Sequence, residues 1–298
     1  MDSQVHVIGA TGRSGLSLCR ALRDGGVAVV PVVRDAAKWR ATGLGGPARV
    51  ADLTDPAALL AALGDAVRVV GCAHARHTAA ILAAAPAPAR LVLLGSTRRH
   101  TRWPDAHGNG VLAGEAALLA SGHGGVILHP TMIYGAEGED NVQRLAALLR
   151  RLPVVPRPGG GRALVQPIHQ DDVTRCVCAA LAVAWDGPHA MVIAGPSPLP
   201  YADFVRAVAA AAGLRRPRLL SVPAWLLRAA APLTALPGLP RIRGEEIRRL
   251  LEDKAFPIAE MIATLGVRPV PLHEGLARTF ARGTGPHLPP LRRHAACP

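Results

Sequence analysis

The chain has 298 residues, of which 50% are hydrophobic and 18% are charged, and its formal net charge is +13. This composition excludes a disordered chain, because the apolar content is enough to bury a large core. The arginines are scattered along the whole length without interleaved aromatic residues, so we expect no nucleic-acid partner. The cysteines lack metal-ligand spacing and no leader peptide is evident, which predicts a cytoplasmic protein without a metal site.

The most informative segment follows the first predicted strand, residues 5–8. Glycines recur at every third position directly after this strand, and a predicted helix over 16–23 comes next. A sharp strand-to-helix turn needs glycine where the backbone bends and where a pyrophosphate approaches it. The helix N-terminus then offers unpaired N–H groups to phosphate. An ordinary glycine turn is the alternative, but we favour a dinucleotide loop formed by Gly9, Ala10, Thr11, Gly12, Arg13, Ser14 and Gly15.

Short β-branched runs then alternate with alanine-rich runs. Asp55 and Pro56 form a favoured helix start, with a side-chain cap followed by proline at the first helical position. The alternation predicts an α/β fold with a doubly wound parallel Rossmann sheet that binds its ligand at the carboxyl ends of the strands. The predicted strands cover 27–33, 49–51, 67–72, 91–94 and 126–128, and helices cover 78–85 and 112–120.

The pattern changes after Tyr134, where prolines become frequent. Residues 153–161 predict an exposed loop, a helix runs from Asp171 to Leu181, and a strand covers 190–194. We interpret residues 134–282 as a smaller, partly interleaved substrate-binding region. The Rossmann domain then covers 1–133 with a contribution from 163–194, and residues 283–298 form a loose tail. The apolar run 223–239 predicts a packed helix, with contact to a membrane surface as the minor alternative.

Several segments together resemble the extended and atypical short-chain dehydrogenases of the NAD-dependent epimerase/dehydratase superfamily. The resemblance implies that Asp52 and Leu53 contact the adenine, that Pro130 lines the cofactor site, and that Ser96 and Thr97 belong to the catalytic centre. It covers most of the chain but identifies no substrate. The segments are 9–15 (G-A-T-G-R-S-G), 33–35 (V-R-D), 52–55 (D-L-T-D), 94–97 (L-G-S-T), 129–135 (H-P-T-M-I-Y-G), 166–173 (Q-P-I-H-Q-D-D-V) and 194–196 (A-G-P).

The chain departs from this family at the proton-transfer residues. Family members use a Tyr-x-x-x-Lys pair, and neither tyrosine of this chain is followed four residues later by lysine. Alignment on Glu115 places His107 at the tyrosine position and Val111 at the lysine position. A histidine can act as an acid or base near neutral pH, so His107 is a catalytic candidate. The sequence H-G-N-G at 107–110 nevertheless predicts a flexible loop, in which His107 would be a solvated residue.

The residues after the second strand bear on the choice of dinucleotide. NAD sites usually place a carboxylate at this point for the ribose 2′-hydroxyl. Here Arg34 occupies it, Asp35 comes one residue later, and Arg13 lies in the glycine loop. Two guanidinium groups can bind a 2′-phosphate in a bidentate manner. We therefore expect NADP(H) as the cofactor. Two alternatives stay open: NAD(H) as the cofactor, and Arg34 as an exposed structural residue at the end of the strand.

Three functions remain open at this point. The first is an NADP(H)-dependent oxidoreductase or epimerase-like enzyme with a non-standard acid/base group and a small-molecule substrate. The second is a catalytically silent NADP(H)-binding protein, such as a sensor or a respiratory-complex accessory protein, because the accessory subunit of complex I belongs to the atypical group. The third is a protein that binds anionic lipid on a Rossmann scaffold. The retained serine, threonine and substrate-region motifs favour the first.

Overall fold

The computed structural model describes residues 4–135, 141–152, 154–223, 225–227 and 248–281. Its central feature is a seven-stranded sheet in the order β11-β6-β5-β4-β1-β2-β3, in which all neighbouring strands are parallel. This order confirms the predicted doubly wound α/β fold. The strands are β1 (Val5–Ile8), β2 (Val29–Val33), β3 (Arg49–Val50), β4 (Arg68–Gly71), β5 (Arg90–Leu94), β6 (Gly125–Pro130) and β11 (Pro188–Ile193).

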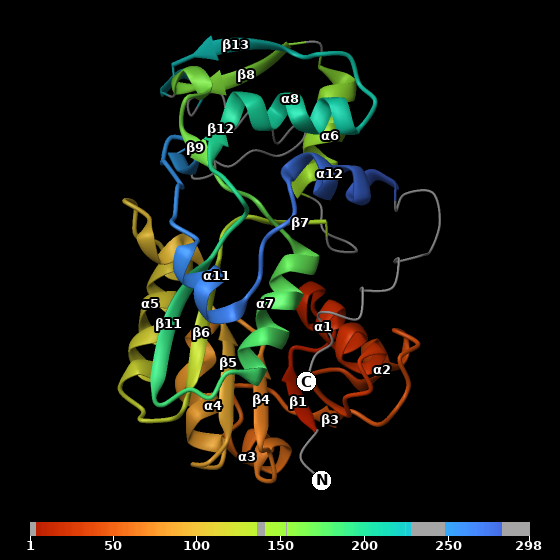
Figure 1. Ribbon diagram of the computed structural model, residues 1–298, viewed down its shortest axis with the longest axis vertical. Coiled ribbons are helices and arrows are strands. Elements are labelled where there is room, and N and C mark those ends of the chain that lie inside the picture. The colour runs from red at the N-terminus through yellow and green to blue at the C-terminus, as the bar shows by residue number, and fades with distance from the viewer. Residues whose placement is uncertain (1–3, 136–140, 153, 224, 228–247, 282–298) are drawn as a thin grey trace.

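Helices cover both faces of this sheet (Figure 1). One apolar core joins β1 to α1, α7 and α11 through residues such as Val7, Leu18 and Val177. A second core joins the sheet to α3, α4 and α5 through Leu59, Ile81 and Leu118. Since both faces are covered, all residues of the internal strand β6 are buried. The helices are α1 (Arg13–Asp24), α3 (Pro56–Leu63), α4 (Thr78–Ala84), α5 (Ala106–Leu119), α7 (Gln170–Ala182) and α11 (Ala259–Leu265), and the short α2 (Ala36–Arg40) follows β2.

The start of α5 corrects the expectation of a flexible loop around His107. The helix begins at Ala106 rather than at residue 112, and His107 lies in its first turn. The Asp105 side chain accepts a hydrogen bond from the Gly108 N–H at 2.7 Å, which caps the helix. The glycines suggested a loop because they have low helix propensity, whereas the cap and the packing of α5 against residues 75–77 override it.

A smaller layer lies beyond the carboxyl edge of the large sheet (Figure 1). Its core contains Tyr134, Phe204 and Leu276. The proline-rich segment 154–158 is a strand here and not the loop we expected. A two-stranded ribbon leaves one edge of the strand without backbone partners, so prolines without N–H are tolerated. The elements are β7 (Ile133–Tyr134), α6 (Asn141–Arg151), β8 (Val154–Pro158), β9 (Leu164–Val165), β10 (Ile168–His169), β12 (Leu199–Pro200), α8 (Tyr201–Ala211), β13 (Arg218–Val222) and α12 (Leu272–Ala281), with β8 paired to β13.

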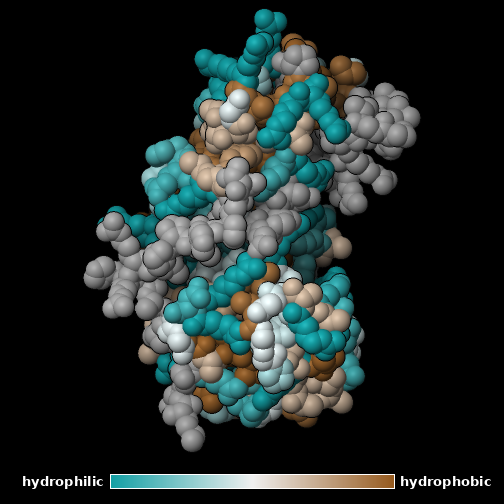
Figure 2. Space-filling view, turned by 90° about the vertical axis from the view of Figure 1, so that its right-hand side faces the viewer, coloured by the Kyte–Doolittle hydropathy of each residue, from teal (hydrophilic) through white to brown (hydrophobic). Residues whose placement is uncertain are grey.

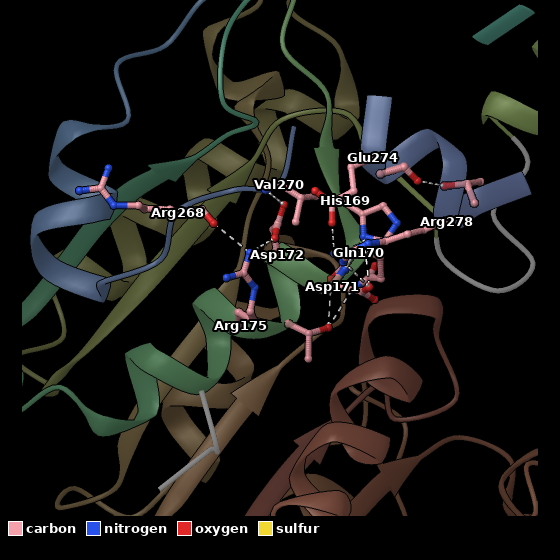
Figure 3. A network of polar contacts seen from close by, with 12 residues as sticks. His169, Gln170, Asp171, Asp172, Arg175, Arg268, Val270, Glu274 and Arg278 are labelled. Atoms are coloured by element: carbon pink, nitrogen blue, oxygen red, sulfur yellow. Dashed lines mark hydrogen bonds and ion pairs between the residues drawn. The ribbon is translucent and has the colours of Figure 1, made fainter. Parts of the chain in front are cut away.

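Polar contacts from the segment 166–173 join the two layers (Figure 3). The Gln170 amide oxygen accepts a hydrogen bond from the Ser14 hydroxyl at 2.9 Å, which links α7 to the start of α1. The buried Asp172 accepts from the Val270 N–H at 2.9 Å and pairs with Arg175. These contacts hold residues 268–270 and the following helix α12 against the large sheet. The motif that resembled the dehydrogenase family therefore has a structural role in this chain.

The surface over α1 and α2 mixes hydrophilic and hydrophobic residues (Figure 2). Within the described ranges, no helix is both long and apolar enough to cross a membrane. Most of the apolar run 223–239 and the expected tail 283–298 lie outside the described residues. The proposed domain boundaries at 133 and 163–194 stay a prediction.

A buried histidine joins the carboxyl ends of the neighbouring strands β5 and β6. His129 Nδ1 accepts a hydrogen bond from the Ser96 N–H at 3.1 Å, and His129 Nε2 lies 2.7 Å from Glu115 Oε2 on α5. A Cβ atom at Gly95 would lie 2.3 Å from His129 Nδ1, so only glycine leaves room for the imidazole. Arg99 also pairs with the Glu115 carboxylate. Three elements thus meet at one imidazole.

The buried His129 predicts a loss of stability in acid. Burial lowers its pKa to about 4 from an ordinary value of 6.5, and the Arg99 guanidinium acts in the same direction. The unfolded chain binds the proton first as pH falls, so the free energy of unfolding decreases between pH 6.5 and 4. Over the whole range the expected loss from this residue is about 3 kcal/mol, of which about 2 kcal/mol falls between pH 7 and pH 5. Urea unfolding at these two pH values measures that part.

The variant His129→Asn provides the comparison, since its amide oxygen can accept from the Ser96 N–H but does not titrate. We expect lower stability than wild type at pH 7 because of the lost packing, but a smaller decrease between the two pH values. Other histidines contribute equally to both proteins, so the difference isolates His129. An identical pH dependence in the two proteins would show that His129 does not carry the effect.

Candidate functional site

The expected site residues follow different strands of the sheet but gather at one edge. The parallel strands β1, β2, β3, β4, β5 and β6 all end at this edge, which faces the smaller layer (Figure 1). Ligands of doubly wound sheets bind at this position. The structure therefore brings the glycine loop, Arg34, Asp52, Ser96 and Pro130 to the same side of the molecule.

The glycine loop makes the turn from β1 into α1. Gly9 has a φ angle of +74°, which L side chains rarely adopt. Gly12 is the exposed N-cap of α1 and provides no side-chain cap for the first helical N–H groups. A Cβ atom on Gly15 would lie 2.2 Å from the Gly9 carbonyl oxygen, so this contact requires glycine. The loop presents an uncapped helix N-terminus, which suits an anionic ligand.

The residues around Arg34 form the far end of this edge. Arg34 is exposed after β2, whereas Asp35 caps α2 by accepting from the Ala37 N–H at 2.8 Å. Asp52 accepts hydrogen bonds from the Thr54 hydroxyl and N–H, which lower its pKa, and the positive charges of Arg34 and His77 act in the same direction. The carboxylate after β2 is thus used for capping. Arg34 and Asp35 are both exposed, but Arg34 takes no part in the cap.

Ser96 and Thr97 lie at the central part of the edge, after β5. The Ser96 hydroxyl accepts a hydrogen bond from the Arg98 N–H at 3.2 Å and caps the short helix η2 (Thr97–His100). The Thr97 hydroxyl lies 3.3 Å from the Pro130 carbonyl oxygen, to which it donates. Both side chains are partly exposed, so a ligand can reach them. Leu53 is partly buried and packs on the core near α3.

His107 has a partner that the sequence did not reveal. Its ring contacts the His74 ring edge-on, with 4.2 Å between the ring centroids. His74 Nδ1 accepts from the Arg76 N–H at 3.0 Å, which leaves the His74 proton on Nε2. Burial lowers the pKa of His107, and Arg98 lowers it further while Asp105 opposes them. His107 is therefore mostly neutral at pH 7.

Arg98 connects the two catalytic candidates. Its backbone N–H donates to the Ser96 hydroxyl, which caps η2, and its guanidinium pairs with Asp105, the residue that caps α5. One side chain thus holds the turn after β5 next to the helix that carries His107. No local sequence motif singles out Arg98 or His74. The position of strand ends could have indicated His74, because it follows β4 directly.

The alignment of His107 and Val111 with the family's tyrosine and lysine is consistent with their places on α5. Val111 is buried in the core, so the lysine position has no polar function here. Tyr134 and Tyr201 are located in the smaller layer on β7 and α8. Lys38 lies on α2, whereas Lys254 lies in the segment that faces η2. The described residues contain no group of three or more metal-ligating side chains.

Solved structures of other proteins share this fold. No protein-family model and no curated protein sequence matches the chain. The solved structure of gox2253 matches with a TM-score of 0.74 at 18% identity and covers 95% of this chain and 99% of its own. The NADPH complex of the quinone oxidoreductase QOR2 from Escherichia coli matches with a TM-score of 0.72 at 18% identity, covering 93% and 99%.

A third similar structure is MoeE5 in complex with UDP-glucose and NAD. It has a TM-score of 0.69 at 21% identity, and the match covers 93% of this chain and 97% of MoeE5. These matches extend over nearly the whole of each chain, so they include the smaller layer as well as the large sheet. The chain therefore shares its fold with gox2253, QOR2 and MoeE5.

Proposed function

We propose that the chain is an NADP(H)-dependent oxidoreductase of the atypical short-chain dehydrogenase type, acting on a small-molecule substrate. The observation that carries the proposal is the uncapped N-terminus of α1, located at the carboxyl edge of the sheet with Arg34 on one side and Ser96 on the other. A dinucleotide is long enough to contact all three places. The fold shared with structures solved with NADPH or NAD supports the same ligand.

The residues present fit the cofactor. The pyrophosphate is assigned to the N–H groups of the glycine loop, where Gly12 leaves the helix terminus open. Arg34, assisted by Arg13, is assigned to the 2′-phosphate, because the nearest carboxylate is engaged in capping α2. Asp52 and Leu53 are assigned to the adenosine end. Pro130 and Ser96 are assigned to the nicotinamide end, which lies next to the smaller layer.

The chemistry at the nicotinamide end requires a hydride and a proton. The bound cofactor supplies or accepts the hydride, and the protein must bind the substrate oxygen and move the proton. Ser96 and Thr97 offer hydroxyl groups for that oxygen at the end of β5. His107 is our candidate for proton transfer, held at the start of α5 by the Asp105 cap. Its lowered pKa favours proton acceptance at neutral pH and proton donation in mild acid.

A second function is favoured by specific contacts at the same residues. The Ser96 hydroxyl accepts from a backbone N–H, the Thr97 hydroxyl donates to Pro130, and the lysine position is the buried Val111. A protein that binds NADP(H) without turnover would have such a satisfied site. The experiments below separate the two functions, because they measure cofactor binding and turnover independently.

The first prediction concerns cofactor preference. We expect NADPH to bind more tightly than NADH, and Arg34→Ala to lose about 1.5–3 kcal/mol of NADPH binding free energy, because a charge-assisted contact to the 2′-phosphate is removed. The affinity for NADH should change little. Fluorescence titration of both reduced cofactors gives the dissociation constants.

The matched control is Arg40→Ala, which removes an equally exposed arginine at the end of α2. It should leave both dissociation constants unchanged. Equal weakening of NADPH and NADH by Arg34→Ala would show that Arg34 is structural. Failure of the wild-type protein to bind either cofactor would contradict the proposed function.

The second prediction concerns turnover. The double variant Ser96→Ala with Thr97→Val should abolish oxidation of NADPH by carbonyl or quinone substrates while NADPH binding is retained. His107→Ala should lower kcat by about 10²–10⁴-fold, the usual contribution of a positioned acid or base. Reduction by wild type should accelerate as pH falls from 8 towards the lowered pKa of His107, and the variant should lose this dependence. Absorbance of the reduced nicotinamide measures the rate.

Ser121→Ala serves as the control, since Ser121 caps the far end of α5 through the Leu118 carbonyl. It should retain full activity. A fully active Ser96/Thr97 double variant would exclude these hydroxyls from catalysis. NADPH binding without turnover of a broad substrate panel would favour the silent cofactor-binding protein.

A further inference from the structure

The segment 249–256 lies against the end of η2, the short helix that begins at the catalytic candidate Thr97. Glu252 is buried and accepts hydrogen bonds from the Thr101 hydroxyl at 2.8 Å and the Arg102 N–H at 2.6 Å. The Phe256 ring lies 5.4 Å from the His100 ring. Lys254 comes between these two contacts, so its segment runs along the end of η2, the short helix that Ser96 caps.

Among the described residues, Lys254 forms no ion pair. Lys254 is half-buried, and its ammonium donates a hydrogen bond to the Arg249 carbonyl oxygen at 3.0 Å. No carboxylate of the described residues lies within ion-pair distance of it. The nearby Glu252 carboxylate is already engaged by Thr101 and Arg102. A desolvated ammonium without a paired anion is unfavourable, unless a ligand completes the pair.

The charges around Lys254 are mostly positive as well. Burial lowers the pKa of Lys254, Glu252 opposes this, and the Arg249 and Arg98 guanidinium groups lower the pKa further. The same Arg98 and Arg249 lower the pKa of His107. Lys254 and His107 therefore share two cationic neighbours, although they are 147 positions apart in the sequence. Arg98 pairs with Asp105 through its terminal nitrogen, while its buried Nε has no hydrogen-bond partner within the described part of the chain.

We infer that the substrate carries an oxyanion, a carboxylate or a phosphate, and that Lys254 binds this group with Arg98 beside it. The inference rests on the proposed function, since it assigns the substrate class for the same site. The anion would lie between η2, the first turn of α5 and residue 254, next to Ser96 and His107. The reacting carbon of the substrate would then face the nicotinamide end of the cofactor site. The cofactor phosphates are assigned elsewhere, to the glycine loop and Arg34, so they do not neutralise Lys254.

The test titrates small oxyanions into the full-length protein. Inorganic phosphate and malonate are added separately at constant ionic strength, balanced with chloride, in the presence of saturating NADPH. The melting temperature is expected to rise in a saturable manner with at least one of them, because an anion that binds only the native state stabilises it. Saturation with malonate indicates a carboxylate substrate, and saturation with phosphate indicates a phosphorylated one.

The variant Lys254→Gln should weaken anion binding by at least about tenfold, since it removes a charge-assisted hydrogen bond. Without anion it should melt at or above the wild-type temperature, because an unpaired desolvated charge is removed. The control Arg206→Gln removes an exposed arginine on α8 and should behave as wild type. NADPH binding should be unchanged in both variants.

Equal anion affinity in wild type and Lys254→Gln would overturn the inference, and so would the absence of saturable stabilisation by either anion. A Lys254→Gln protein that melts well below wild type without anion would show that Lys254 is structural, which also overturns it. The titration is repeated without cofactor. Saturable, Lys254-dependent anion binding in a protein that fails to bind NADPH would support the anion site while contradicting the proposed function.

Discussion

The contact between the buried imidazole of His129 and its neighbours determines the shape of the candidate site. His129 accepts from the Ser96 N–H and lies against Glu115, so the end of β5, the end of β6 and α5 keep fixed relative positions. Arg98 extends this arrangement from Ser96 to Asp105, the cap of the helix that carries His107. A hydroxyl and an imidazole from different elements are thus held at one strand end. If the imidazole becomes charged, the elements lose their common support.

The smaller layer depends on a different set of polar contacts. Gln166 bonds to the Gly195 carbonyl and to the backbone of Phe256, while Asp172 bonds to Val270. These contacts bring residues that are far apart in sequence to the carboxyl edge of the sheet. The position of Lys254 follows from them, because its segment is held between Phe256 and Glu252. The same hydrogen bonds therefore hold both the smaller layer and the segment of the proposed oxyanion site.

The sequence predicted the sheet and the cofactor loop because both depend on local patterns. Buried parallel strands are apolar runs, and the turn after β1 needs glycine at 9 and 15 for backbone reasons alone. The helix around His107 and the strand with Pro156 were missed, since a side-chain cap and a free strand edge override propensity there. The placement of the segment with Lys254 against the end of η2 could not be predicted, because it depends on how distant segments pack. The assignments of Arg34, Asp52, Ser96 and Pro130 to the cofactor stay predictions.

We propose that NADP(H) lies along the carboxyl edge of the sheet from Arg34 to Ser96. A crystal structure of the protein soaked with NADP⁺ would test this placement. We expect the pyrophosphate at the N-terminus of α1, the 2′-phosphate against Arg34, and the nicotinamide between Ser96 and Pro130. An empty glycine loop at saturating cofactor, or a nicotinamide located at the Arg34 end, would contradict it.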